Sequence, residues 1–239
     1  MLRQAVILAA GPGSRLRPLT DERPKAALPV AGPPLVWRAL EALGAWGVRD
    51  VVIVVGHRRR ALEAVLAGWS GGRLRLVENA DWPTTNTLAS LLCAAPLVEG
   101  DFLLLDGDLL FAPEVLEPLG EPGTRLAVDR GRPLDEEAVK VAVADGRITG
   151  VGKRLAPGQV PVAESIGLAR IEAGLAPALF DAGRQIVGAG GAAAYYEAAL
   201  QRLLERGARL LPADVTGRRW VEIDDHDDLR RAERLFAAV

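Results

Sequence analysis

A glycine-rich turn followed by two cations is the first feature of the chain that suggests chemistry. The apolar run Ala5–Ala9 leads into Gly11 and Gly13, and Arg15 and Lys25 follow. A turn of this kind after a strand exposes backbone N–H groups to an anionic ligand. Positive side chains close to it neutralise the charge of a polyphosphate during group transfer. The pattern therefore predicts a polyphosphate-binding loop, and a simple surface turn with exposed arginine is the alternative.

Two common phosphate-binding motifs do not fit this turn. A dinucleotide fingerprint needs a third glycine, but Leu16 occupies that position. It also needs an acidic residue after the second strand, where this chain has Gly56-His57. A Walker A loop needs Gly-Lys followed by Ser or Thr, which is absent. Neither motif therefore accounts for the turn, and both a different polyphosphate-binding loop and a simple surface turn stay open.

Two pairs of carboxylates have the spacing of residues on one side of a strand. Asp106 and Asp108 follow the apolar run Phe102–Leu105, and Glu222 and Asp224 repeat the spacing near the C-terminus. Residues two apart on a strand point to the same side, and open α/β sheets bind ligands at the carboxyl ends of their strands. Oxygen ligands of this kind suit Mg²⁺. The alternative is that they cap loops or, for the second pair, the N-terminus of the last helix.

The glycine-rich turn lies within a longer motif that resembles the signature of the nucleoside-triphosphate-transferring family. The motif reads Ala10-Gly11-Pro12-Gly13-Ser14-Arg15-Leu16-Arg17-Pro18-Leu19-Thr20, followed by Pro24-Lys25 and Pro29-Val30. The family includes sugar-1-phosphate nucleotidyltransferases and the phosphocholine and inositol-phosphate cytidylyltransferases. A motif of this length is much more specific than a pair of glycines.

This resemblance implies roles for individual residues. It places the catalytic cations at Arg15 and Lys25, on the triphosphate, and the Mg²⁺ ligands at Asp108 and Asp224. The residues that it implies for nucleotide binding are Leu8, Ala9, Ala10, Gly11, Gly13, Asn86, Ser90 and Asp106. The implied reaction is in-line attack of an acceptor phosphate on the α-phosphorus with release of pyrophosphate, which depends on positioning and charge neutralisation.

Three further segments resemble the phosphocholine cytidylyltransferase branch more than the hexose-1-phosphate branch. They are Asn86-Thr87-Leu88-Ala89-Ser90-Leu91, Tyr195-Tyr196-Glu197 and Trp220-Val221-Glu222-Ile223-Asp224, so that the resemblance covers nearly the whole chain. It implies CTP as the nucleotide, with Asn86 and Ser90 near the base.

The residues that bind the acceptor, the phosphorylated molecule that receives the nucleotidyl group, are expected on and near a hairpin at about 139–151. Lys140 and Lys153 lie on its two strands, and the resemblance places the acceptor phosphate at Lys153, with Lys140, Glu164 and Tyr196 as further acceptor-binding residues. A solvated sheet face is the alternative for Lys140. A choline cage needs aromatic residues, which make up only 5% of the chain, and Ala193 stands where the choline enzymes have an acidic residue. Inositol phosphate, another polyol phosphate or a phosphonate is therefore also open.

The elements that must position these residues alternate in the first half of the chain. Strands are expected at Ala5–Ala9, Val51–Val55, Leu74–Val77 and Phe102–Leu105, and helices at Leu35–Trp46, Arg58–Leu66 and Thr87–Ala95. Strands separated by helices indicate a parallel sheet. After about Pro113 we expect a hairpin at Val139–Val143 and Ile148–Val151, strands at Val162–Ile171 and Arg219–Ile223, and helices at Tyr195–Arg206 and Leu229–Phe236.

This order predicts an α/β fold, a three-layer sandwich with a mostly parallel mixed central sheet of the Rossmann-like, GT-A type. We expect one domain over residues 1–239, with a nucleotide-binding half at 1–112 and an acceptor-binding half at 113–239. No apolar run reaches the length of a membrane helix, no signal peptide is evident, and Cys93 is the only cysteine. These features predict a cytoplasmic protein without a membrane partner.

The charge composition limits the classes of binding partner that are expected. The net charge of −2 argues against a nucleic-acid partner, and the sequence leaves a monomer or a homodimer open. Of 29 basic residues only Lys25, Lys140 and Lys153 are lysines. A GC-rich genome explains the scarcity but not the positions, which suggests that these three need a compact ammonium.

The leading prediction is a Mg²⁺-dependent cytidylyltransferase that couples CTP to a phosphorylated small alcohol, resembling phosphocholine or inositol phosphate. One alternative is a sugar-1-phosphate nucleotidyltransferase that uses UTP, dTTP or GTP. The other is a non-catalytic nucleotide-binding regulatory protein, against which the intact cations and carboxylates count.

Overall fold

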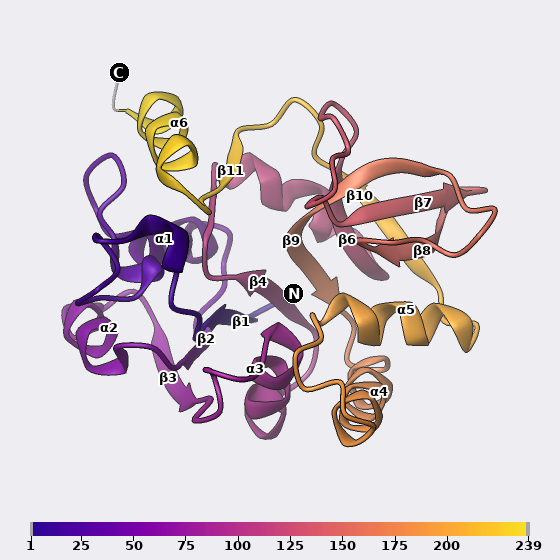
Figure 1. Cartoon of the computed structure of the whole chain (residues 1–239), viewed down its shortest axis with the longest axis horizontal. Helices are drawn as coiled ribbons and strands as arrows, with labels where there is room; N and C mark the ends of the chain where they lie inside the picture. The colour runs from indigo at the N-terminus through magenta and orange to yellow at the C-terminus, as the bar shows by residue number, and fades with distance from the viewer. Residues whose placement is uncertain (1, 238–239) are drawn as a thin grey trace.

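A mixed sheet forms the centre of the computed structural model, which describes residues 2–237 (Figure 1). Its strands lie in the order β10-β6-β9-β4-β1-β2-β3, and the hairpin β7-β8 joins it through β9. The strand bounds are β1 Gln4–Ala9, β2 Asp50–Val55, β3 Arg73–Glu78, β4 Phe102–Asp106, β6 Thr124–Asp129, β7 Lys140–Ala144, β8 Arg147–Gly152, β9 Pro161–Ile171 and β10 Leu210–Asp214. A separate antiparallel pair consists of β5 Leu109–Phe111 and β11 Trp220–Glu222.

Most neighbouring strands of the central sheet run in parallel. Strand β1 pairs in parallel with β2 and β4, β2 with β3, and β6 with β10. Strand β9 runs antiparallel to β4 and β6, so that the long return strand joins the two parallel groups. The carboxyl ends of β1 and β4 therefore lie side by side, as the sequence predicts.

Helices cover both faces of the sheet. Their bounds are α1 Leu35–Ala45, α2 Arg59–Leu66, α3 Thr87–Ala94, α4 Ala176–Gly188, α5 Glu197–Glu205 and α6 His226–Phe236. Short 3₁₀ turns lie at Ser14–Leu16, Lys25–Ala27, Ala95–Leu97 and Pro113–Gly120.

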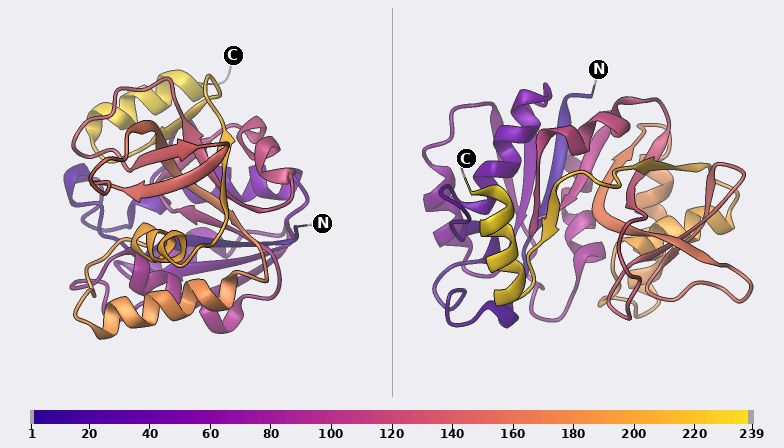
Figure 2. Two further views of the ribbon diagram at one scale, coloured as in Figure 1. Left: turned by 90° about the vertical axis from the view of Figure 1, so that its right-hand side faces the viewer. Right: turned by 90° about the horizontal axis from the view of Figure 1, so that it is seen from above.

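Strand β1 shows why three layers form, because its side chains alternate between two cores. Ala5 and Ile7 pack with residues of α1 and α2, whereas Val6 and Leu8 pack with residues of α3, α4 and α5. Figure 2 shows the strands between α4 on one side and α6 on the other. The predicted α/β sandwich is confirmed.

The predicted hairpin is present, and its turn has the predicted geometry. Asp145 and Gly146 connect β7 to β8 with φ angles of 49° and 70°. Helix α4 and strands β5, β6 and β10 were not predicted from the sequence. Strand β10 contains Pro212 and pairs with β6 alone, which is an edge position that tolerates proline. None of the helices within residues 2–237 has the length and apolar character needed to cross a bilayer.

Candidate active site

A cavity of about 870 Å³ opens beside the carboxyl ends of β1 and β4. Residues expected at the site that line it are Leu8, Ala9, Ala10, Gly11, Gly13, Arg15, Lys25, Asn86, Ser90, Asp106, Asp108, Lys153, Glu164 and Asp224. They come from segments that span almost the whole sequence, so the fold brings together nearly every residue that the motif analysis selected.

Backbone and side-chain bonds fix the shape of the glycine-rich turn. Gly13 has a φ of 61°, and a Cβ there would lie 3.0 Å from the Cβ of Lys25. The Thr20 hydroxyl donates to the Gly13 carbonyl over 2.9 Å. The His57 backbone N–H donates to the Ala10 carbonyl over 3.0 Å. The turn therefore needs glycine at position 13, because this φ favours glycine and because Lys25 packs against it.

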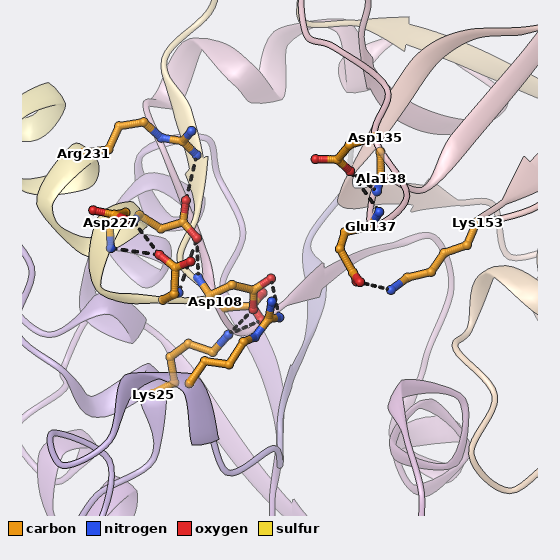
Figure 3. Close-up of polar contacts among 12 residues, drawn as sticks. Lys25, Asp108, Asp135, Glu137, Ala138, Lys153, Asp227 and Arg231 are labelled. Carbon is orange, nitrogen blue, oxygen red and sulfur yellow. Dashed lines mark hydrogen bonds and ion pairs between the residues drawn. The ribbon is translucent and has the colours of Figure 1, made fainter.

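Lys25 lies at the centre of the charged cluster (Figure 3). Its ammonium donates to Asp108 Oδ2 and to Asp224 Oδ1, each over 2.9 Å. Arg15 approaches the other oxygen of Asp224 with its guanidinium at 2.9 Å. Burial opposes the charge of Lys25, but the two carboxylates outweigh it and raise the pKa of Lys25 above its usual value. Lys25 therefore stays positively charged at neutral pH.

Three carboxylates form a group that fits a divalent cation. Ligand atoms of Asp108, Glu222 and Asp224 lie within 4.8 Å of one another. Among the described residues, Asp108 Oδ1 is buried and has no hydrogen-bond partner. Burial and the charges of Asp108 and Asp224 raise the pKa of Glu222 to about 8. A group of oxygen donors of this kind is suited to Mg²⁺, and Glu222 adds a third ligand to the two expected.

Asp106 and Asp108 both line the cavity, but they do not lie on one strand as expected. Strand β4 ends at Asp106, and the chain turns at Gly107, whose N–H donates to the Leu8 carbonyl over 2.9 Å. The two carboxylates are therefore not on one strand, and that part of the spacing argument was wrong. A Cβ at Gly107 would lie 2.7 Å from the Leu8 carbonyl oxygen, so the tight turn depends on glycine. Burial and nearby carboxylates raise the pKa of Asp106 well above its usual value.

The N-cap of the last helix is Asp225, not Asp224. The Asp225 carboxylate accepts from the N–H groups of Asp227 and Asp228, and Asp228 completes a capping box. Asp224 is thereby free to bind Lys25 and Arg15. Although burial opposes it, these two cations hold the pKa of Asp224 below its usual value.

Helix α3 begins at the wall expected to contact the base. Asn86 is its N-cap and accepts from the Thr87 N–H over 2.9 Å. The Asn79 amide donates to the hydroxyl of Ser90 over 3.1 Å, and Asn79 and Trp82 also line the cavity. Asn79 was not predicted, because its position depends on a buried contact rather than on a motif.

Lys153 lies on the opposite wall, as Figure 3 shows. Its ammonium donates to Glu137 over 2.7 Å and lies 5.2 Å from the ring centre of Tyr195. The bond to Glu137 raises the pKa of Lys153. Glu164 is half-buried beside this wall, and burial raises the pKa of Glu164.

Two residues expected at the acceptor side do not line the cavity. Tyr196, the N-cap residue of α5, is completely buried in the core, and its neighbour Tyr195 lines the cavity instead. The Lys140 ammonium donates to the carbonyls of Asp135, Ala138 and Lys153. Lys140 therefore binds backbone atoms of the cavity wall rather than the open cavity, and both expectations are corrected.

Glu197 is a cavity residue to which the sequence analysis gave no role. It lines the cavity with a side chain that is almost fully buried, and its Oε2 has no hydrogen-bond partner within residues 2–237. Burial raises the pKa of Glu197 to about 7. The only sequence signal was its place in Tyr195-Tyr196-Glu197.

The glycine-rich turn, a largely buried lysine and a carboxylate cluster meet at one edge of the mixed central sheet. This combination is typical of nucleotidyltransferases. Comparison with known families agrees: residues 5–205 match the MobA-like NTP transferase domain, and the chain belongs to this family. The family predicted from the motif is therefore confirmed.

Curated relatives span the chain but are longer than it. This chain is 37% identical over 247 residues to a CMP-5'-(3-aminopropyl)phosphonate synthase of Streptomyces rubellomurinus. The aligned region covers 98% of this chain and 39% of that protein. The chain is 31% identical over 243 residues to a bifunctional IPC transferase and DIPP synthase of Rubrobacter xylanophilus, which covers 97% and 51%. The chain thus spans about half or less of the length of these relatives.

Solved structures share the fold. The inositol-1-phosphate CTP transferase from T. maritima superimposes with a TM-score of 0.84 at 27% identity, over 99% of this chain and 96% of that one. The CTP:phosphocholine cytidylyltransferase from Streptococcus pneumoniae superimposes with a TM-score of 0.77 at 20% identity, over 98% and 99%. At 20% identity the second likeness supports the fold alone.

Proposed function

We propose that the protein is a Mg²⁺-dependent cytidylyltransferase. It joins CMP from CTP to a small acceptor that carries a phosphate or phosphonate group at one end and an amino group at the other. This proposal rests on the meeting of Lys25 and Arg15 with the carboxylates of Asp108 and Asp224 at one edge of the cavity. Lys153 and Glu197 line the same cavity.

Binding of the triphosphate is the first step. The glycine-rich turn offers backbone N–H groups to the phosphates, and Arg15 and Lys25 supply two positive charges. Lys25 is pre-positioned by Asp108 and Asp224, so little reorganisation is needed when the nucleotide arrives. Mg²⁺ held by Asp108, Glu222 and Asp224 would neutralise charge on the triphosphate and on the departing pyrophosphate.

The chemical step requires no covalent residue. An oxygen of the acceptor phosphate or phosphonate attacks the α-phosphorus of CTP and forms a new P–O bond. The bond from that phosphorus to the oxygen bridging to the β-phosphate breaks in line, and both its electrons leave with pyrophosphate. The acceptor attacks as an anion, so no proton has to be removed. Catalysis then consists of alignment and charge neutralisation by this chain's cations.

Glu197 and Glu164 favour an acceptor with an amino group. A buried carboxylate that faces a cavity without a partner is costly unless a donor satisfies it, and an ammonium supplies both charge and hydrogen bonds. The 37% identical relative is a CMP-5'-(3-aminopropyl)phosphonate synthase, whose named product contains such a group. Inositol phosphate offers hydroxyl groups but no positive charge. The aminoalkyl acceptor is therefore preferred.

Pyrophosphate release from a matrix of substrates tests this proposal. CTP, UTP, dTTP and GTP are each combined with 3-aminopropylphosphonate, phosphocholine, inositol 1-phosphate and glucose 1-phosphate. We expect the highest kcat/KM with CTP and 3-aminopropylphosphonate. A preference for glucose 1-phosphate with another nucleotide would instead identify a sugar-1-phosphate nucleotidyltransferase. No release from any pair would favour a non-catalytic nucleotide-binding protein.

A further inference from the structure

Arg132 occupies a position that neither the motif nor the proposed steps explain. Its guanidinium lies 3.6 Å from the ring centre of Trp220 and donates to the Trp220 carbonyl over 2.9 Å. The Trp220 indole N–H donates to Asp129 over 2.8 Å, and Arg132 lies 3.8 Å from the same carboxylate. A flat guanidinium on a buried indole is held in one orientation, so Arg132 is a rigid part of the cavity wall.

Most of the hydrogen-bond donors of Arg132 have no protein partner. An arginine carries five N–H donors, and within residues 2–237 this one makes the single hydrogen bond to Trp220. Only 29% of its side chain is exposed, and it lines the cavity. Donors that are partly withdrawn from water and directed at a cavity are satisfied when an anion binds there.

A second guanidinium, that of Arg231, lines the same cavity from α6. Arg231 lies 3.2 Å from Asp228 Oδ1, and the other oxygen of Asp228 accepts from the N–H groups of Asp224 and Asp225. Arg231 is therefore anchored, through Asp228, to the segment that carries the metal-site carboxylate of Asp224. Burial and, to a smaller degree, the charge of Arg231 lower the pKa of Arg132, whereas the carboxylates of Glu164, Asp129 and Asp228 raise it. The two guanidinium groups are therefore close enough to interact.

The position of Arg132 indicates which anionic group would bind there, that of the acceptor or that of the nucleotide. Arg132 lies in the 130–139 loop that follows β6, and Asp135 and Glu137 of the same loop line the wall that contains Lys153. Its stacking partner Trp220 is two residues from Glu222 on β11, which corresponds to about 7 Å along a strand. An anion on Arg132 would thus lie between the acceptor wall and the carboxylate cluster, where the attacking oxygen must be.

We propose that Arg132 and Arg231 form an anion-binding pair that receives the phosphate or phosphonate group of the acceptor, separately from the triphosphate site at Arg15 and Lys25. The inference rests on the proposed function for the identity of the acceptor, but the binding of a phosphonate anion is testable without any nucleotide. Arg132 then determines how tightly the acceptor binds and aligns its oxygen, whereas Lys153 contacts it from the opposite wall.

Titration of methylphosphonate into the nucleotide-free full chain, followed by ³¹P NMR, tests the pair. Arg132→Met keeps the apolar stem on Trp220 but removes the charge, and Arg231→Met is a second variant at a more exposed position. We expect each to weaken methylphosphonate binding roughly tenfold or more, the loss of a charged hydrogen bond. Arg130→Met is the matched control, because Arg130 pairs with Asp214 and does not line the cavity.

Binding of CTP with Mg²⁺ is measured for the same variants. We expect it to change less than twofold in Arg132→Met. Unchanged methylphosphonate binding in both cavity variants would overturn the inference, as would a loss of CTP binding as large as the loss of methylphosphonate binding. If Arg132→Met does not fold, the affinity of Arg231→Met for methylphosphonate tests the inference. A wild-type protein that binds methylphosphonate through Arg132 but turns over no CTP would refute the proposed function and leave the anion pair intact.

Discussion

At the scale of single residues, Lys25 links two carboxylates of the site. Its ammonium donates to both Asp108 and Asp224, and we propose that it also contacts the triphosphate during transfer. A compact ammonium fits between the two carboxylates and beside Gly13, whereas a planar guanidinium needs more space. This explains why lysine is retained at position 25 in a chain that otherwise uses arginine.

Replacing Lys25 with Met or Arg is expected to lower turnover by about 10²-fold or more, because a pre-positioned charge is lost or displaced. Initial rates of pyrophosphate release measure the effect. Arg17→Met is the control, since Arg17 is exposed and pairs only with Asp21 among the described residues. Near-wild-type rates in both Lys25 variants would exclude a role for this lysine in catalysis.

Glu197 makes stability depend on pH in a predictable direction. Burial raises its pKa from 4.5 to about 7, so between these values the folded chain binds more protons at this residue than the unfolded chain. The free energy of unfolding therefore decreases as pH rises through this window, by up to about 3 kcal/mol at pH 8, and the residue has no effect below pH 4.5.

Glu197→Gln removes this dependence. We expect the variant to gain stability relative to wild type between pH 5 and pH 8, and urea unfolding at several pH values measures the difference. Glu205→Gln, at the exposed end of the same helix, controls for a general effect of removing a carboxylate. A constant difference between Glu197→Gln and wild type across this pH range would contradict the raised pKa.

At the scale of elements, helix α6 links folding to the carboxylate cluster. Its capping box joins Asp225 to Asp228, and Asp228 also accepts from the backbone N–H of Asp224. The start of the helix thus fixes the segment from which Asp224 reaches Lys25.

Asp225→Ala removes the N-cap, and we expect a loss of about 1 kcal/mol in the free energy of unfolding. Denaturant unfolding measures this loss. Asp227→Ala is the matched control in the same helical turn, because its side chain is exposed and it caps nothing. Equal stability of the two variants would show that the capping box contributes no stability.

Sequence patterns predicted the elements of the first half well because βα periodicity determines them. They missed α4, which contains a glycine in mid-helix, and β10, which contains a proline that only an edge strand tolerates. The motif identified Lys25, Asp108 and Asp224 because each falls within a recognisable segment. Arg132 had no such signal, since its contact with Trp220 joins positions 88 residues apart.

At the scale of the whole molecule, the carboxylate cluster joins segments from distant parts of the chain. A cation that binds only the folded state stabilises it, by about 2.7 kcal/mol at a concentration of 100 Kd. For a chain of this size each kcal/mol corresponds to about 2–4 °C. Millimolar MgCl₂ is therefore expected to raise the thermal unfolding midpoint by several degrees.

Asp108→Asn should abolish this stabilisation by Mg²⁺, whereas Asp135→Asn, which lines the cavity outside the cluster, should retain it. Thermal unfolding with MgCl₂ and with chelator measures both. Equal Mg²⁺ effects in the two variants would place the cation elsewhere.

The central claim is that this site transfers CMP to the phosphate or phosphonate oxygen of an acceptor. The most direct measurement is mass spectrometry of the products formed from CTP, 3-aminopropylphosphonate and MgCl₂, with pyrophosphate quantified in the same reaction. We predict a product whose mass equals that of the acceptor plus CMP minus water, formed in equal amount with pyrophosphate. Release of pyrophosphate with free CMP and no coupled product, or no consumption of CTP, would contradict it.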